Sequence, residues 1–394
     1  MQRKTFMTIL RILLILILVV IIVPTMQDYF SQPTPEEANI GYNASTAYAV
    51  VDQIIEEGTI ILGDVTQPYQ IFLVKILDGP HAGKIFQIDY GTRQLRSDRV
   101  HLKLGDKILV TISENPVNNE VSAYFTDFSR QTSLLWLFII FCVASVTISG
   151  WKGLRSLIGI FLSIFIIILI ILPGIREGKD PLLVTLAGAA LFVSLSLYIV
   201  YGWTVKTHTA FIGSLIAMTF TGILALIFVN STKLTGFGDE NVFYIAQLTN
   251  NQMDYLNLLL AGIIIGTLGV LDDLVVSQSS AIFELYKQNP DLSIMQLFRS
   301  GMNIGKDHIA ATVNTLVLAY AGTSLPMLLL FSFHSIDYGM VLNLEFIAEE
   351  IVRTLVGSLG LFAAVPVTTC LAALVAVKYR NFGKLKIYLG PLNE

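Results

Sequence analysis

The chain has 394 residues, of which 54% are hydrophobic and 14% are charged, and its formal net charge at pH 7 is −4. Soluble domains carry about 25% charged residues, so this composition excludes an ordinary soluble domain and predicts a membrane protein. The two cysteines, Cys142 and Cys370, lie in apolar runs, which argues against a disulfide framework and against a cysteine-ligated metal site.

The chain begins with two basic residues and a long apolar run. Arg3 and Lys4 precede this run, which extends from Phe6 to Val23. The run is long for the core of a secretory signal peptide, and no small-x-small cleavage site follows it. We therefore expect residues 1–24 to form an uncleaved signal anchor, which is also the first transmembrane helix.

Residues 25–130 are more polar and contain five short runs that are typical of β-strands. The runs are separated by turn residues and comprise 46–55, 69–77, 84–90, 107–112 and 121–125. They predict a small all-β domain, either an OB-like barrel or a sandwich. No nucleophile, metal cluster or aromatic ladder stands out in this segment, so we favour an accessory or interaction domain.

The rest of the chain is dominated by apolar runs that are long enough to span a bilayer. Seven such runs lie at about 133–149, 157–173, 182–202, 208–230, 257–280, 310–333 and 352–377. With the anchor they predict a membrane all-α bundle of about eight transmembrane helices, with the all-β domain after the first helix. Residues 131–378 then form a seven-helix domain and residues 379–394 a basic tail.

The basic residues predict how the helices are oriented. An even number of helices places both termini on one side, where the loops contain Lys152, Arg155, Lys206, Lys287, Arg299, Lys306 and Lys378. The short loops opposite contain only Arg176, Lys179 and Lys233, with Arg353 at a helix end. The positive-inside rule therefore places both termini in the cytoplasm and residues 25–130 outside the cytoplasmic membrane. Because this rule accounts for the basic residues, the lipid bilayer is the expected partner and nucleic acid is not.

The most informative run contains two adjacent acids, Asp272 and Asp273. An ionised carboxylate at a helix centre costs about 2.5–3.5 kcal/mol even on lenient insertion scales, so acids at this depth indicate a function by default. On an α-helix, Asp273 belongs to a stripe formed by Gly262, Gly266, Gly269, Asp273, Ser277, Ser280 and Glu284. We expect this stripe to pack against a neighbouring helix, because small residues let helices approach closely.

The next apolar helix offers polar partners for the two acids. From its expected cytoplasmic end, these are Lys306, Asp307, His308, Thr312, Asn314 and Thr315. If the two helices are antiparallel neighbours, Asn314 and Thr315 reach the depth of Asp273. The connecting residues 290–307 are expected to form an amphipathic helix on the membrane surface.

Burial suggests how such a group could work. In a low-dielectric site a carboxyl group favours its neutral form, and a second carboxyl beside it favours retention of one proton. The acid pair is therefore a candidate proton relay or ion site. Its expected partners are His308, Thr312, Asn314 and Thr315, with Ser277, Asp307 and Lys306 in secondary positions. The alternative is structural, with both acids hydrogen-bonded to the next helix, and no catalytic, metal or cofactor site is predicted.

Two long segments carry a family resemblance. LGVLDDLVVSQSSAIFEL (268–285) and GKDHIAATVNTLVLAYAGTSLP (305–326) resemble the signature segments of the YibE/F-like bacterial membrane proteins. The layout of anchor, outer β domain and multi-helix carboxyl half is similar too. The resemblance implies a bacterial cytoplasmic-membrane protein and brings no established substrate or reaction.

A looser similarity is to the proton-driven RND exporters and the SecD/SecF motor. It rests on the acid pair, the amphipathic connection and the polar start of the following helix. This chain has two extra helices, no second half and a far smaller outer domain, so only a proposal about proton coupling carries over. With half the helices of such an exporter, the chain is expected to form a homodimer.

Three classes of function remain open from the sequence. The leading hypothesis is a transporter or energy-transducing component that uses the acid pair for proton or ion coupling. An intramembrane aspartyl protease would need its acids on different helices, and HExxH, GxSxG and a Cys/His pair are absent, so no enzyme is predicted. The third class is a non-transporting receptor or assembly partner that acts through the outer β domain on an extracytoplasmic protein.

Overall fold

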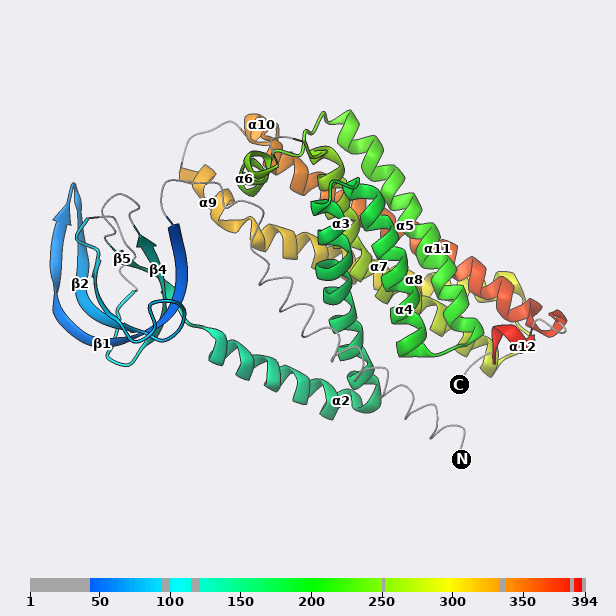
Figure 1. The fold of residues 1–394 in the computed structure, drawn as a ribbon. Coiled ribbons are helices and arrows are strands. Elements are labelled where there is room, and N and C mark those ends of the chain that lie inside the picture. Colours follow the sequence, from blue (N-terminus) through cyan, green and yellow to red (C-terminus); the bar gives the residue numbers. More distant parts are fainter. Residues whose placement is uncertain are drawn as a thin grey trace. The chain divides into compact units, whose positions relative to one another are not determined.

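The computed structural model describes residues 43–93, 100–114, 121–249, 252–333, 338–382 and 386–391. The chain divides into two compact units, Met1–Ile148 and Ser149–Glu394 (Figure 1). The predicted signal anchor, residues 1–24, lies outside the described residues.

The first unit is built around an antiparallel sheet. Its strands are β1 (Asn43–Leu62), β2 (Val65–Ile76), β3 (Ile85–Tyr90), β4 (Lys107–Glu114) and β5 (Val121–Phe128). The strand order is β3-β2-β1-β4-β5, and β3 also contacts β5, so the sheet curls toward closure. All five predicted strands are present, and the curled sheet agrees with the predicted small all-β domain.

The long strand β1 organises this sheet, because it pairs with both β2 and β4. It extends well past the predicted run 46–55. Register shifts after Val51 and Ile54 mark irregularities that bend a strand and let it continue. The hairpin to β2 turns at Gly63, whose φ of 63° suits a glycine. Alternate residues of β2 and β4 form the core, namely Phe72, Val74, Ile76, Ile108, Val110 and Ile112.

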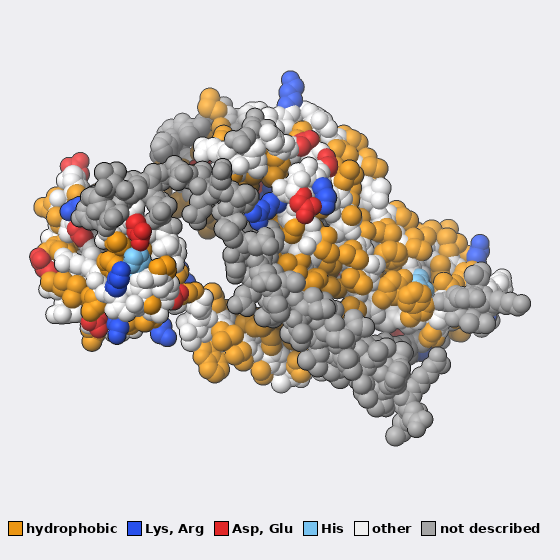
Figure 2. Space-filling model, viewed as in Figure 1, with side chains coloured by type: hydrophobic (Ala, Val, Ile, Leu, Met, Phe, Trp, Pro, Cys, Tyr) orange, Lys and Arg blue, Asp and Glu red, His pale blue; other side chains and the backbone are white. Residues whose placement is uncertain are grey.

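The second unit is a bundle of long helices. Helix α2 (Gln131–Ile166) enters it and is interrupted at Gly150. A π-helical turn (Ile167–Ile171) leads to α3 (Leu172–Arg176), α4 (Pro181–Tyr201), α5 (Val205–Ser231), α6 (Glu240–Leu248), α7 (Tyr255–Gln288), α8 (Ile294–Thr323), α9 (Leu325–Phe333), α10 (Tyr338–Val341), α11 (Glu345–Lys378), a 3₁₀ turn (Tyr379–Asn381) and α12 (Lys386–Leu389). Hydrophobic side chains cover much of the visible surface of this unit (Figure 2), as expected for helices surrounded by lipid.

Helices α5, α7 and α11 form the centre of the bundle and pack closely on one another. Glycines allow this approach. A Cβ on Gly213 would lie 2.7 Å from Thr368 Oγ1, and one on Gly357 would lie 2.7 Å from Thr267 Cγ2. Any larger residue at these positions would push the helices apart.

The described helices agree with the predicted spans. Six are long and apolar enough to cross a bilayer, and the bent pair α8–α9 is a seventh if it counts as one span. The chain is therefore a multi-pass membrane protein. The predicted helix over 290–307 is present from Ile294 but is not separate from the next span, because α8 runs without a break to Thr323 and the chain bends by 60° before α9. Burial of Gly301, Gly305 and Ile309 along α8 draws this segment into the bundle.

Candidate functional site

Helix α7 carries the acid pair near the middle of its length. The helix begins after Asp254, whose side chain accepts from the backbone N–H of Asn257. An N-cap of this kind satisfies one of the otherwise unpaired N–H groups of the first turn. From there the chain stays helical to Gln288, so Asp272 and Asp273 project about 100° apart from a rigid element.

Asp272 lies on a flank of α7 and is half-buried. Leu271 and Leu274, which flank the acid pair, are buried in the main hydrophobic cluster of the bundle. The Oδ1 atom of Asp272 is buried and has no hydrogen-bond partner among the described atoms. The phenol of Tyr201, at the end of α4, lies within electrostatic range of both acids, and Lys206 Nζ lies 5.9 Å from the centre of its ring. Asp272 is thus a half-buried acid with one enclosed oxygen that lacks a direct partner.

Asp273 is exposed within the helical unit, and so is the glycine stripe to which it belongs. Apart from the adjacent residues and the backbone of α7 itself, no described atom lies within 4 Å of a Cβ placed on Gly262 or Gly269, and one on Gly266 meets Tyr320 Oη at 3.1 Å. Among the described residues, the glycines of this stripe are thus not closely packed, although Gly266 and Ser277 of the stripe contact Tyr320 and His308 of α8. The glycines that permit close packing lie on the partner helices and face the opposite side of α7, where Gly213 approaches Val275.

Helix α8 is an antiparallel neighbour of α7, as predicted. Ser277 Oγ and His308 Nδ1 are 3.3 Å apart, and Tyr320 reaches Gly266 further along the pair. This register puts Thr312 at the level of Asp273, because both lie four residues from the Ser277–His308 contact. Ser277 and His308 are both half-buried. Among the described residues, theirs is the only direct hydrogen bond that joins two predicted site residues.

The other predicted partners lie on the more open side of α8. Asn314 and Thr315 are exposed, and Thr315 Oγ1 donates to the Ala311 carbonyl of its own helix. Lys306 and Asp307 are exposed as well, while Thr312 is half-buried. Among the described contacts, no hydrogen bond joins Thr312, Asn314 or Thr315 to either acid.

Gln278 is a central polar residue that the sequence analysis did not single out. It is buried on α7, and its Nε2 donates to the Gly301 carbonyl of α8 and to Thr369 Oγ1 of α11, both at 2.7 Å. One side chain thereby joins three helices. The signal that could have revealed it is the Gly301-xxx-Gly305 spacing on α8, which marks a close helix crossing.

A second polar cluster lies where α11 begins. Glu345 Oε1 accepts from the backbone N–H groups of Thr235 and Gly236 at 2.5 and 3.0 Å. The buried Glu349 accepts from the N–H of Gly238 at 3.1 Å, and Arg353 pairs with Glu350 at 2.7 Å. Glu345 and Glu349 thus attach the loop after α5 to α11 and help to hold the bundle together.

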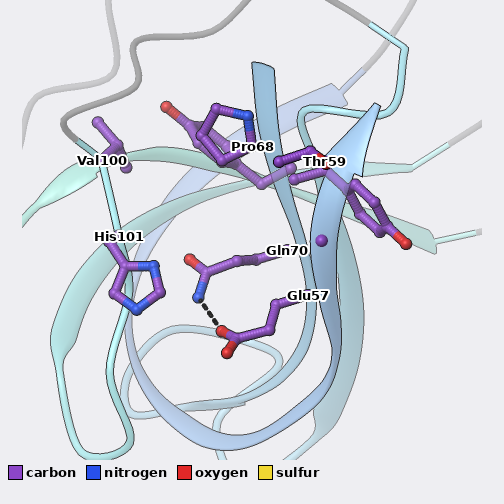
Figure 3. Close-up of a pocket in the computed structure, with 9 residues that line it drawn as sticks. Glu57, Thr59, Pro68, Gln70, Val100 and His101 are labelled. Atoms are coloured by element: carbon purple, nitrogen blue, oxygen red, sulfur yellow. Dashed lines mark hydrogen bonds between the residues drawn. The ribbon is translucent and has the colours of Figure 1, made fainter. Parts of the chain in front are cut away.

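The first unit contains a separate pocket of about 300 Å³. Its polar residues are Glu57, Gln70 and His101, and Pro68 and Val100 add apolar surface. Figure 3 shows the Gln70 amide donating to Glu57 Oε2, at 3.2 Å, with the His101 ring beside them. Gln70 also exchanges two hydrogen bonds with the backbone of Leu102, which fixes the pocket wall. A carboxylate and an imidazole in such a pocket suit a cationic or hydrogen-bonding group of a partner.

Comparison with known proteins identifies the family. A family model described as YibE/F-like protein matches residues 137–378, more than half of the chain. The chain belongs to the YibE/F-like family. The matched range contains Asp272, Asp273 and all of α8, whereas the sheet of the first unit lies outside it. No curated protein and no solved structure matches the chain. Among the described residues, no group of three or more His, Cys, Asp or Glu side chains is arranged to hold a metal ion.

Proposed function

We propose that this YibE/F-like protein is a transporter or an energy-transducing component that uses Asp272 and Asp273 for proton or ion coupling. The observation that supports this most directly is the buried, unpartnered Oδ1 of Asp272 inside a membrane-spanning helix. Acids at this depth are costly, so they are kept where they bind or release an ion. The substrate is not specified by this argument.

The two acids differ in their surroundings, and we propose different roles for them. Asp272 is half-buried with an enclosed Oδ1, which suits the group that holds the proton. Asp273 is open and suits the group that exchanges protons with water. His308, held by Ser277, lies one helical turn from Asp273 in depth and is the proposed neighbour in the path. Thr312, Asn314 and Thr315 would line this path.

We propose a location in the bacterial cytoplasmic membrane, with both termini in the cytoplasm and residues 25–130 outside. The distribution of Lys and Arg in the loops supports this orientation. A homodimer is the proposed assembly, because one chain supplies about half the helices of an RND-type exporter. We further propose that the protein is not an enzyme, since adjacent acids on α7 point about 100° apart and do not face one another across a substrate bond.

Proton movement in proteoliposomes tests the coupling. Vesicles with an internal pH-sensitive dye would receive wild-type protein, Asp272→Asn, Asp273→Asn, the double variant, or the control Asp291→Asn, an exposed acid after α7. We expect a pH gradient to decay faster with wild type than in empty vesicles, Asp272→Asn to abolish this, Asp273→Asn to reduce it, and the control to have no effect. Wild-type flux in the double variant would eliminate the relay.

A second readout needs no substrate. Dicyclohexylcarbodiimide modifies carboxyl groups that are neutral and surrounded by apolar groups, so we expect it to label Asp272 in the wild-type protein at neutral pH. Peptide mass spectrometry would locate the label, and the peptide that contains Asp291 is the internal control. Equal labelling of both peptides would contradict an enclosed neutral acid at Asp272.

The alternative function is that of a non-transporting receptor or assembly partner. The pocket around Glu57 and Gln70 favours it, because it offers a defined surface on the outer unit. Affinity capture with the full-length protein, and with Glu57→Ala as the matched variant, tests this proposal. A stoichiometric extracytoplasmic partner that is lost in Glu57→Ala would support it, and equal capture by both proteins would contradict a role for the pocket.

A further inference from the structure

An apolar groove lies between α5 and α11, at the end of the bundle where α5 begins and α11 ends. Its volume is about 210 Å³, which is room for roughly seven groups of the size of a water molecule or methylene, at about 30 Å³ each. The walls are formed by residues that lie about one turn apart along each helix. These are Val205, His208 and Ile212 on α5, and Leu371 and Val375 on α11.

The groove opens toward lipid. Ile212 is 48% exposed, and Leu371 and Val375 are half-buried. Exposed aliphatic side chains on a membrane-spanning helix face the hydrocarbon of the bilayer. A hollow with these walls therefore adjoins acyl chains. Its polar lining residues are His208, whose Nδ1 bonds to Tyr198 Oη, and Thr209, whose Oγ1 donates to the Val205 carbonyl.

The C-terminal segment closes the opposite side of the groove. Leu389 of α12 and Phe382 both line it. The segment is fixed in this position, because the N–H of Val205 donates to the Pro391 carbonyl at 3.1 Å and Tyr379 Oη donates to the Gly390 carbonyl at 2.8 Å. Gly390 has a φ of 78°, which suits a glycine at this turn. The hollow is thus framed by three parts of the chain.

Two basic residues lie about one helical turn from residues that line the groove, Lys378 after Val375 and Lys386 before Leu389. Lys378 is exposed and continues the α11 face of Leu371 and Val375 by one turn. Lys386 begins α12, with its Nζ 5.3 Å from the centre of the Tyr379 ring. In the sequence, residues 202–212 and 366–393 contain no Asp or Glu, and Glu394 follows them.

The adjacent end of α7 carries an ion-paired acid, and the start of α5 is flanked by interfacial aromatic groups. Glu284, on the adjacent end of α7, is 3.8 Å from Lys287. Trp203 is 60% exposed and stacks on Tyr198. Aromatic rings beside lysines are typical of the boundary between hydrocarbon and headgroups.

We propose that this groove binds one acyl chain of an anionic phospholipid, and that Lys378 and Lys386 hold its phosphate. Basic residues immediately outside a transmembrane helix are the usual recognition element for anionic lipids. The apolar hollow beside them offers contacts for an acyl chain, which a soluble phosphate lacks. This proposal is independent of the proposed coupling role of Asp272 and Asp273, which lie outside the groove.

Native mass spectrometry of the full-length protein, released from nanodiscs of equal phosphatidylglycerol and phosphatidylcholine, tests the site. We expect wild type to retain phosphatidylglycerol selectively. Lys378→Gln/Lys386→Gln should lower this retention roughly thirtyfold, the effect of removing two lysine contacts with an anionic headgroup. Lys287→Gln, on the adjacent helix, is the control and should retain the lipid.

A second variant separates the acyl chain from the headgroup. Val375→Phe fills the hollow and leaves both lysines in place, so we expect it to lose phosphatidylglycerol as well. Soluble glycerol phosphate should not compete with the lipid in wild type. Equal retention of the two lipids, wild-type retention by the double lysine variant, or full competition by glycerol phosphate would overturn the proposal. Size-exclusion profiles confirm that each variant is folded.

Discussion

Helix α7 presents two faces that differ in what surrounds their small residues. On the packed face, Thr267, Val275 and Gln278 lie against glycines of α11, α5 and α8. On the open face, Gly262, Gly266 and Gly269 lead to Asp273, and little contacts them. The difference shows that a glycine stripe permits close packing without specifying it. Close packing follows where a larger side chain on the partner fills the space above the glycine, as Thr267 does at Gly357.

The largest expected effect is on the packed face. Gly357→Leu would push its side chain into Thr267, so we expect a loss of about 3 kcal/mol in stability, the upper range for overpacking. Gly262→Leu, the matched change on the open face, should alter stability by less than about 0.5 kcal/mol. Unfolding in mixed detergent micelles measures both. Equal losses for the two variants would show that both faces are packed.

Gln278→Leu should have the next largest effect. It removes the two hydrogen bonds that Gln278 donates to the Gly301 carbonyl and to Thr369 Oγ1, at an expected cost of about 2 kcal/mol. Gln247→Leu, an exposed residue of α6, is the control in the same unfolding assay. A double-mutant cycle with Thr369→Val should show coupling between the two positions. Additive effects would contradict a direct role of the Gln278–Thr369 bond.

Replacing Asp272 should have the opposite effect on stability, an increase. Asp272→Asn keeps the volume of the side chain and removes a group that is difficult to accommodate in apolar surroundings, so we expect stability to rise by about 1 kcal/mol. Asp273→Asn, on the open face, should leave stability unchanged. The same unfolding assay distinguishes the two. A clear loss of stability in Asp272→Asn would favour the structural interpretation, in which the acids hold the bundle together.

The smallest effect is expected at the contact between α7 and α8. Ser277→Ala removes the contact with His308, and side-chain hydrogen bonds between membrane helices contribute about 0.6 kcal/mol on average. Ser280→Ala, on the same stripe, is the control. If Ser277→Ala destabilises the protein as much as Gln278→Leu, the open face contributes more to packing than its exposure indicates.

Much of the fold was predictable from local patterns. Alternation in residues such as Phe72, Val74 and Ile76 predicts the strands, and long apolar runs predict the helices, because both signals come from neighbouring residues in one element. The length of β1 was underestimated, since its irregularities after Val51 and Ile54 interrupt the alternation. The continuity of α8 was missed because burial of Gly301 and Gly305 depends on a partner helix.

The candidate site, like the fold, was predictable from the sequence only where neighbouring residues of one element carry the signal. The sequence by itself determined that two acids lie in an apolar helix of a YibE/F-like chain and that a helix with polar residues follows. Only the tertiary structure decided that Asp272 is half-buried while Asp273 is exposed, and that Gln278 joins α7 to α8 and α11. The physical reason is that helical periodicity gives the angle between side chains on one helix, whereas their burial depends on which neighbouring helices cover each face.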